Sequence, residues 1–342
     1  TTIGLATNTQ HTISIAAVND DSTATTTFST EVSLYTNATT PSAATLSSTG
    51  AQNLRIVMAT DTNPAANTTY IVKDTNASVG LKYLQTDATW GNATATLSWH
   101  QLGGGSATAT IGLATNTQHT ISISAVNGDS TATSTYSSTA SMYTMGAVPN
   151  AATLSTVGQQ TLRITMATDT NPSANTTYVV RDTNANVGLR YLQTDATWGV
   201  ATATLSWHQL GGGAATSTIG LATSTSHTIS IAAVNGDNTA SSSYSSTVTL
   251  STLAATPVAP SAVTSTLATT LAITINATTI NSNPTSSTVS FIVRDTASGT
   301  LFLQSNGTWG ATTSTLTWAQ LGSGSATTTT GLTPNTNHII AV

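Results

Sequence analysis

Apolar and polar residues alternate along a segment that occurs four times in the chain. In its second copy, Ile121, Ile123 and Ala125 alternate with threonine and serine, which is the period of a β-strand with one buried face. Each copy carries one histidine, and these histidines are spaced 108, 108 and 111 residues apart: His11, His119, His227 and His338. A period of this length is one small domain, so the pattern predicts tandem domains.

The same strand period recurs elsewhere in each repeat. Leu54, Ile56 and Met58 fall on one face of a predicted strand, and Tyr70 and Val72 fall on one face of the next. Glycine, proline and asparagine clusters separate these segments, as expected of turns. No segment has a sustained helical period, so the predicted fold class is all-β.

Proline-bearing linkers divide the repeats. We expect residues 1–36 to be the C-terminal part of a truncated repeat, residues 37–144 and 145–252 to be whole repeats, and residues 253–342 to be a repeat that lacks its last strand. This is how a window from a longer array would look. Short linkers with proline favour semi-rigid joints, so we predict a rod-like array.

Composition narrows the possible roles. Only 6% of residues are charged, and the seven Lys and Arg residues make a nucleic-acid surface improbable. The chain has no cysteine, which excludes disulfides and metal–thiolate sites. No apolar run is long enough to span a bilayer. Threonine and serine fill the strand faces that charged residues would otherwise occupy.

The order of these segments resembles a known family. Gly331-Leu332-Thr333-Pro334, with His338 six positions after the leucine, looks like the E–F corner of a fibronectin type III domain. The alternating segment that follows resembles strand F of that immunoglobulin-like β-sandwich family. The resemblance covers every repeat, and it implies a fibronectin type III-like array from a bacterial extracellular or surface protein.

This sequence departs from the family pattern at two places. Histidine stands at the corner where the family usually has tyrosine. The family's strand B commonly carries a tryptophan, and here the corresponding residues are Met58, Met166 and Ile275.

The corner histidines suggest either metal or pH chemistry, or a structural role. Copies about one domain apart cannot converge on one ion. We therefore expect each imidazole N–H to bond a backbone carbonyl, as the tyrosine hydroxyl does in a sandwich corner. His100 and His208 become Ala319 in the third repeat, so no chemistry shared by all repeats depends on them.

Pairs of Asx residues invite a calcium interpretation. Asp61-x-Asn63 and Asp74-x-Asn76 place oxygen ligands at alternate positions, but the third repeat has Asn281 and Ala297 where two of them stand. Asx-turns explain the pattern without a metal, so we expect no metal site and no cofactor. A Lys73 isopeptide bond is also rejected, because arginine replaces it in the second repeat.

Two tryptophans per repeat are the remaining candidates for binding. Indole faces could stack on sugars or contact neighbouring subunits, and they could equally pack on their own sandwich. We expect packing on their own sandwich for the tryptophans that stand two positions after a leucine on the same strand face: Trp99, Trp207 and Trp318. The candidates for ligand or inter-subunit contact are those next to a turn glycine: Trp90, Trp198 and Trp309.

These features favour a structural role over catalysis. No Ser/His/Asp set recurs, and the glycine triplet does not precede a helix, so no phosphate cradle is expected. We expect an extracellular or cell-surface stalk, fibre or surface-layer element whose partners are copies of itself. The alternative is an adhesin that binds surface glycans through exposed tryptophans.

Overall fold

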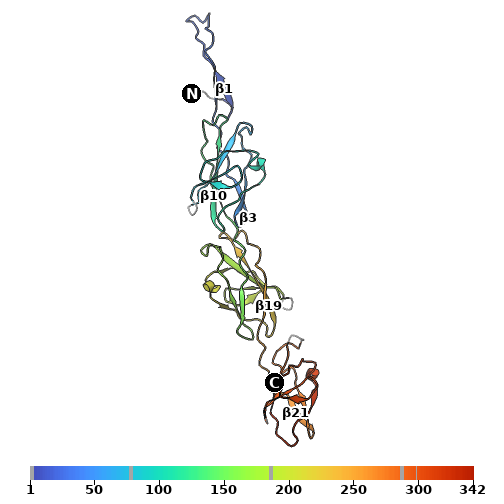
Figure 1. The fold of residues 1–342 in the computed structure, drawn as a ribbon. Helices are drawn as coiled ribbons and strands as arrows, with labels where there is room; N and C mark the ends of the chain where they lie inside the picture. Colours follow the sequence, from blue (N-terminus) through green and yellow to red (C-terminus); the bar gives the residue numbers. More distant parts are fainter. Residues whose placement is uncertain (1–3, 77–79, 185–187, 286–288, 298) are drawn as a thin grey trace. The chain divides into compact units, whose positions relative to one another are not determined.

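The computed structural model describes residues 4–76, 80–184, 188–285, 289–297 and 299–342, and these form strands, turns and three short 3₁₀ turns without any α-helix (Figure 1). The prediction of an all-β fold is confirmed. The strand pairings whose residue register is described are antiparallel.

Two sheets form the repeat at 37–144. The three-stranded sheet has the order β3 (Thr45–Gly50), β4 (Asn53–Val57), β9 (Thr108–Ala109). The second sheet has the order β11 (Ala140–Tyr143), β10 (Gln118–Val126), β5 (Thr69–Asp74), β6 (Lys82–Leu84), β7 (Trp90–Gly91), and β8 (Leu97–Ser98) pairs with β5. The glycine triplet forms a 3₁₀ turn, η1 (Gly103–Gly105).

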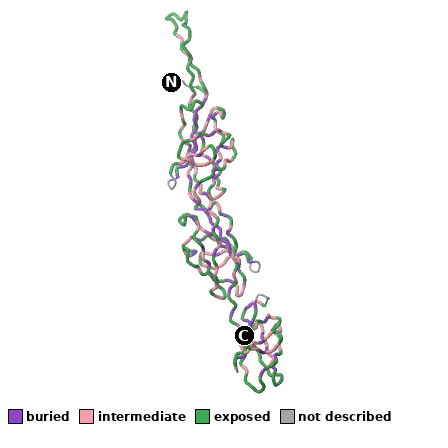
Figure 2. Tube along the Cα trace, viewed as in Figure 1, coloured by how far each residue is buried: buried purple, intermediate pink, exposed green. Residues whose placement is uncertain are grey.

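The core of this repeat lies between its two sheets. As the alternation predicts, Ile56 and Met58 point inward from the three-stranded sheet, and Val72 and Ile123 point inward from the other. All four are at most 1% exposed, and they belong to a single cluster made only of residues from this repeat. Figure 2 colours the buried positions along the trace purple.

The repeat at 145–252 has the same strand order. One sheet contains β12 (Thr153–Thr156), β13 (Leu162–Thr165) and β18 (Thr216–Ser217). The other contains β16 (Trp198–Gly199), β15 (Arg190–Leu192), β14 (Thr177–Asp182), β19 (Ser226–Val234) and β20 (Val248–Ser251), with β17 (Leu205–Ser206) on β14. Its 3₁₀ turn is η2 (Gly211–Gly213).

The repeat at 253–342 keeps this plan with fewer described strands. Its sheets are β21 (Ala262–Leu267), β22 (Thr270–Thr274), β26 (Ala326–Thr330), and β25 (Trp309–Gly310), β24 (Leu301–Leu303), β23 (Arg294–Asp295), β27 (Ile340–Ala341). Its 3₁₀ turn is η3 (Gly322–Gly324).

Residues 4–36 form a two-stranded ribbon. Strand β1 (Gln10–Ile13) pairs with β2 (Val32–Tyr35). Its apolar side chains are exposed, Ile15 by 74% and Phe28 by 71%, because the ribbon has no second sheet to pack on.

Packing divides the chain into two compact units that cut across the second repeat. The first unit joins residues 1–149 to 169–178 and 232–244, and the second holds 150–168, 179–231 and 245–342. Two segments of the second repeat therefore pack with the first repeat.

Candidate functional site

The corner histidine of the first whole repeat, His119, is buried against an aspartate side chain, Asp74. His119 lies on β10 and Asp74 ends β5, and these strands are neighbours in one sheet. The His119 Nδ1 atom lies 2.6 Å from Asp74 Oδ2, and both side chains are 0% exposed. The other carboxylate oxygen accepts the backbone N–H groups of Thr120 (3.0 Å) and Asn76 (3.1 Å).

This arrangement recurs in the other two repeats. His227 Nδ1 lies 2.5 Å from Asp182 Oδ2, and His338 Nδ1 contacts Asp295 Oδ2. The fourth histidine, His11, lies in the N-terminal ribbon, which has no counterpart of β5. We call the three pairs the His–Asp corners: His119 with Asp74, His227 with Asp182, and His338 with Asp295.

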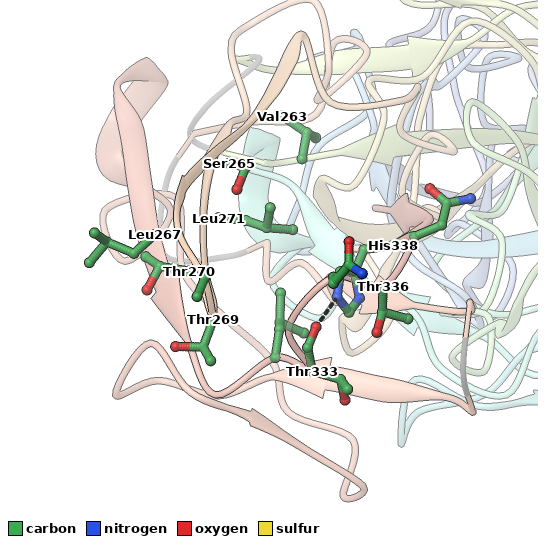
Figure 3. Close-up of a pocket in the computed structure, with 13 residues that line it drawn as sticks. Val263, Ser265, Leu267, Thr269, Thr270, Leu271, Thr333, Thr336 and His338 are labelled. Atoms are coloured by element: carbon green, nitrogen blue, oxygen red, sulfur yellow. Dashed lines mark hydrogen bonds between the residues drawn. The ribbon is translucent and has the colours of Figure 1, made fainter.

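The bonding partner differs from the expected backbone carbonyl. The Nδ1 atom faces a carboxylate because the inward positions of β5 are Tyr70, Val72 and Asp74, so the strand period turns the aspartate into the core. Among the corner histidines that the structure describes, only His338 also contacts a backbone carbonyl. Its Nε2 atom lies 3.3 Å from Thr333 O (Figure 3).

A sequence signal for the aspartate exists. An aspartate on the inward face of an otherwise apolar strand must have buried partners, because an unpaired buried charge is very costly. It occurs in all three repeats, whereas the nearby Asn76 becomes Ala297. The calcium interpretation treated Asp74 and Asn76 as one pair of ligands and missed that only the aspartate recurs in every repeat.

The third corner lowers the pKa of its aspartate, Asp295. Burial alone would raise the pKa of Asp295. The hydrogen bond from His338 and the backbone N–H groups of Ala297 and Ile339 outweigh burial, so the pKa of Asp295 lies below its ordinary value.

The geometry suits support of the corner better than proton transfer. A histidine that serves as general base needs its second ring nitrogen to face a substrate or a nucleophile. The Nε2 atoms of His119 and His227 are buried and have no hydrogen-bond partner among the described residues. The carboxylate instead ties the ends of two strands together through backbone N–H groups on both sides.

The groove drawn in Figure 3 lies beside the third corner. It runs between β21–β22 and the corner, and Leu267, Leu271 and His338 are among its lining residues. In the repeat at 37–144, residues after β11 occupy the corresponding place, where Met145 N–H donates to Gly50 O.

The first Asp-x-Asn pair has a different structural use from the second. Asp61 accepts the backbone N–H of Asn63 (3.0 Å) and its amide N–H (2.8 Å), and Tyr70 donates its hydroxyl at 3.2 Å. Burial, and after it the charge of Asp61, raise the pKa of the Tyr70 hydroxyl. Asn63 also bonds the N–H and C=O groups of Thr39, and so holds the linker.

Two of the candidate tryptophans next to turn glycines, Trp90 and Trp309, pack in the cores of their own repeats. Trp90 and Trp198 are half-buried, and Trp309 is 9% exposed and belongs to the core of its repeat. The indole N–H of each is buried and has no hydrogen-bond partner among the described residues.

The second tryptophan set lies over the glycine triplet. The ring of Trp99 is 6.3 Å from that of Tyr70, and a Cβ on Gly105 would lie 3.5 Å from Trp99 Cζ2. The glycines of the triplet have positive φ, of 81°, 56° and 90°, a backbone conformation that glycine adopts readily, and Gly322-Ser323-Gly324 forms the same turn beneath Trp318.

The remaining candidates do not converge. Within the described residues no three His, Cys, Asp or Glu side chains are placed to share a metal ion. Lys73 lies 3.4 Å from the centre of the Tyr136 ring, a cation–π contact. Among the described residues no helix is long and apolar enough to cross a membrane.

Comparison with known proteins gives structural matches only. No protein-family model matches the chain, and no curated protein matches its sequence. Among solved structures, it is similar to the chicken CNTN1 FN1-FN3 domains, at 14% identity and a TM-score of 0.30 over 71% of this chain and 77% of that one. It is also similar to a two-domain fibronectin type III segment of chicken tenascin, at 14% identity and a TM-score of 0.35 over 62% of this chain and 97% of that one.

Proposed function

We propose that this chain is a structural repeat protein of an extracellular fibre, stalk or surface layer, and that copies of it associate side by side. Its task is to set distance and present surface, and it involves no catalysis. The observation that supports this best is that the core clusters of the repeats at 37–144 and 253–342 each consist only of residues from their own repeat. A chain built of self-sufficient units lengthens simply by repetition.

Surface chemistry supports lateral association. Charged residues are 6% of the chain and its net charge is −5, so long-range repulsion between copies is weak. Exposed strand positions carry threonine and serine hydroxyls, which already pair across strands in this structure. Thr12 Oγ1 and Ser33 Oγ lie 2.7 Å apart, and Thr120 Oγ1 and Ser141 Oγ lie 3.0 Å apart.

Electron microscopy at increasing protein concentration tests the proposal. We expect strings at low concentration and side-by-side bundles or sheets at high concentration. Single strings at every concentration would contradict lateral assembly.

The adhesin remains the second candidate, and the packing of the tryptophans favours the spacer over it. A glycan array separates the two. The adhesin requires binding that is lost in a Trp90→Ala, Trp198→Ala double variant that still folds, whereas the spacer requires no binding.

A further inference from the structure

The contacts between the first whole repeat and the next one centre on one asparagine. Asn116 lies in the corner just before β10, is 0% exposed, and has a left-handed backbone with φ of 42°. Asparagine tolerates this conformation better than most residues. Its own N–H donates to Met145 O at 3.1 Å, which fixes the closing segment of its repeat against the corner.

The side chain of Asn116 makes three hydrogen bonds to the following repeat, through both of its N–H donors and its carbonyl oxygen. Its Nδ2 atom donates to Asn175 O (3.0 Å) and to Thr176 Oγ1 (2.6 Å). Its Oδ1 atom accepts the backbone N–H of Gly236 (2.9 Å). These partners belong to the two segments of the second repeat that pack in the first compact unit.

The same contacts occur at the preceding joint. Asn8 is 0% exposed with φ of 45°, and it bonds Asn67 O (3.0 Å), Thr68 Oγ1 (2.6 Å) and the N–H of Gly128 (2.9 Å). The same three hydrogen bonds therefore form at two successive joints. This recurrence indicates that the joint is a regular structural feature of the repeat.

A tyrosine and a glycine complete each joint. A Cβ on Gly236 would lie 2.6 Å from Tyr143 Cε1, so only glycine permits this approach of the ring. The next residue, Asp237, accepts the backbone N–H of Tyr143 at 3.4 Å. Tyr35, Gly128 and Asp129 repeat the arrangement, with the N–H to carboxylate distance at 3.2 Å.

The asparagine is replaced at the joint that follows. Ser224 keeps the left-handed backbone, with φ of 49°, but its single hydroxyl cannot supply two donors and an acceptor at the reach of an amide. The histidine spacing also grows from 108 to 111 residues across this joint.

We propose that Asn8 and Asn116 are inter-repeat clamps that couple consecutive repeats into one cooperative unit of fixed orientation, and that the joint following Ser224 is the compliant point of the chain. The proposal deepens the spacer function by naming where the array is stiff and where it bends. The contacts themselves do not depend on lateral assembly.

Spin-label distances test the clamp directly. The chain has no cysteine, so cysteines introduced at exposed, equivalent positions carry the only labels. The pair Thr94→Cys with Thr202→Cys reports on the clamped joint, and the pair Thr202→Cys with Thr313→Cys reports on the joint after Ser224. We expect a narrow distance distribution for the first pair and a broad one for the second.

Asn116→Ser should broaden the first distribution until it resembles the second. Serine already occupies this backbone conformation at Ser224, so the variant should fold. Gly236→Ala disturbs the same joint from the other side, and it should also broaden the distribution. The matched control is Asn335→Ser, which changes a left-handed but exposed asparagine and should leave the distances unchanged.

Melting curves give an independent measure. Asn116→Ser leaves buried donors and acceptors unpaired, so it should lower the melting temperature of the coupled repeats by about 5 °C, while Asn335→Ser should change it little. A broad first distribution in the unmodified chain, or no broadening in either joint variant, would overturn the clamp. A stiff chain that fails to bundle would overturn lateral assembly alone.

Discussion

At the scale of single residues, each aspartate in a corner has partners that compensate for its burial. The Asp74 carboxylate accepts hydrogen bonds from one imidazole and two backbone N–H groups while fully buried. Removing one partner of such a pair is more harmful than never having the pair, because the remaining charge stays buried. The corner is therefore a point where one substitution has a large effect on folding.

His119→Phe tests this view. Phenylalanine keeps an aromatic ring at this position, but the buried Asp74 loses its hydrogen-bond partner, so we expect a loss of about 3–5 kcal/mol in the free energy of unfolding. Chemical denaturation measures it, and His100→Phe, at an exposed histidine, is the control. A loss of less than about 1 kcal/mol would show that the imidazole adds nothing beyond packing.

The depressed pKa of Asp295 predicts an acid-sensitive step in stability. A carboxyl whose pKa is lower in the folded state contributes stability that is fully present above its unfolded pKa, near 3.8, and is lost as pH falls through the folded value. The third repeat should therefore weaken below about pH 4. In Asp295→Asn this part of the pH dependence should disappear, whereas Asp20→Asn, at an exposed carboxyl, should retain it.

At the scale of elements, short strands are stabilised by side chains from turns. Strand β7 has two residues, and its tryptophan packs on the core while its indole N–H bonds nothing among the described residues. Gln85 adds to this hairpin by donating to Tyr83 O (2.8 Å) and Ala93 O (2.9 Å). Gly91 leaves room for that amide, since a Cβ would lie 3.1 Å from it.

Trp90→Phe should therefore be well tolerated. Phenylalanine keeps most of the apolar contact and loses no hydrogen bond, so we expect a cost of about 1 kcal/mol, against about 3 kcal/mol for Trp90→Ala. Urea unfolding of the two variants measures the difference. Equal losses would mean that the indole N–H has a partner in solution.

At the scale of the whole molecule, the repeats combine closed cores with contacts that pass from one repeat to the next. Asn171 repeats the role of Asn63 in holding a linker, since it bonds the N–H and C=O groups of Ala147 at 2.7 Å and 3.0 Å. Asn283 does the same for Ala255, at 2.8 Å and 2.7 Å. Linker conformation is therefore set by side-chain amides as well as by proline.

Lateral assembly of the proposed fibre should depend weakly on salt. Hydroxyl and amide contacts are not screened, whereas ion pairs are. Light scattering between about 50 mM and about 500 mM NaCl should show the same critical concentration within about twofold. A steep salt dependence would instead assign the contacts to the few charged residues.

The sequence alone determined the repeat, the all-β class and the inward faces of the main strands. Leu54, Ile56 and Met58 could be placed because the strand period is a local property, readable without knowing which strands are neighbours. Turn residues marked the ends of these strands for the same reason.

Only the tertiary structure decided the partners of the polar residues. His119 and Asp74 are 45 residues apart, and they meet because β10 and β5 pair in one register. Asn116 looks like an ordinary corner residue until the next repeat lies against it. Such contacts depend on which segments the fold brings together, and a local pattern of apolar and polar residues carries no record of that choice.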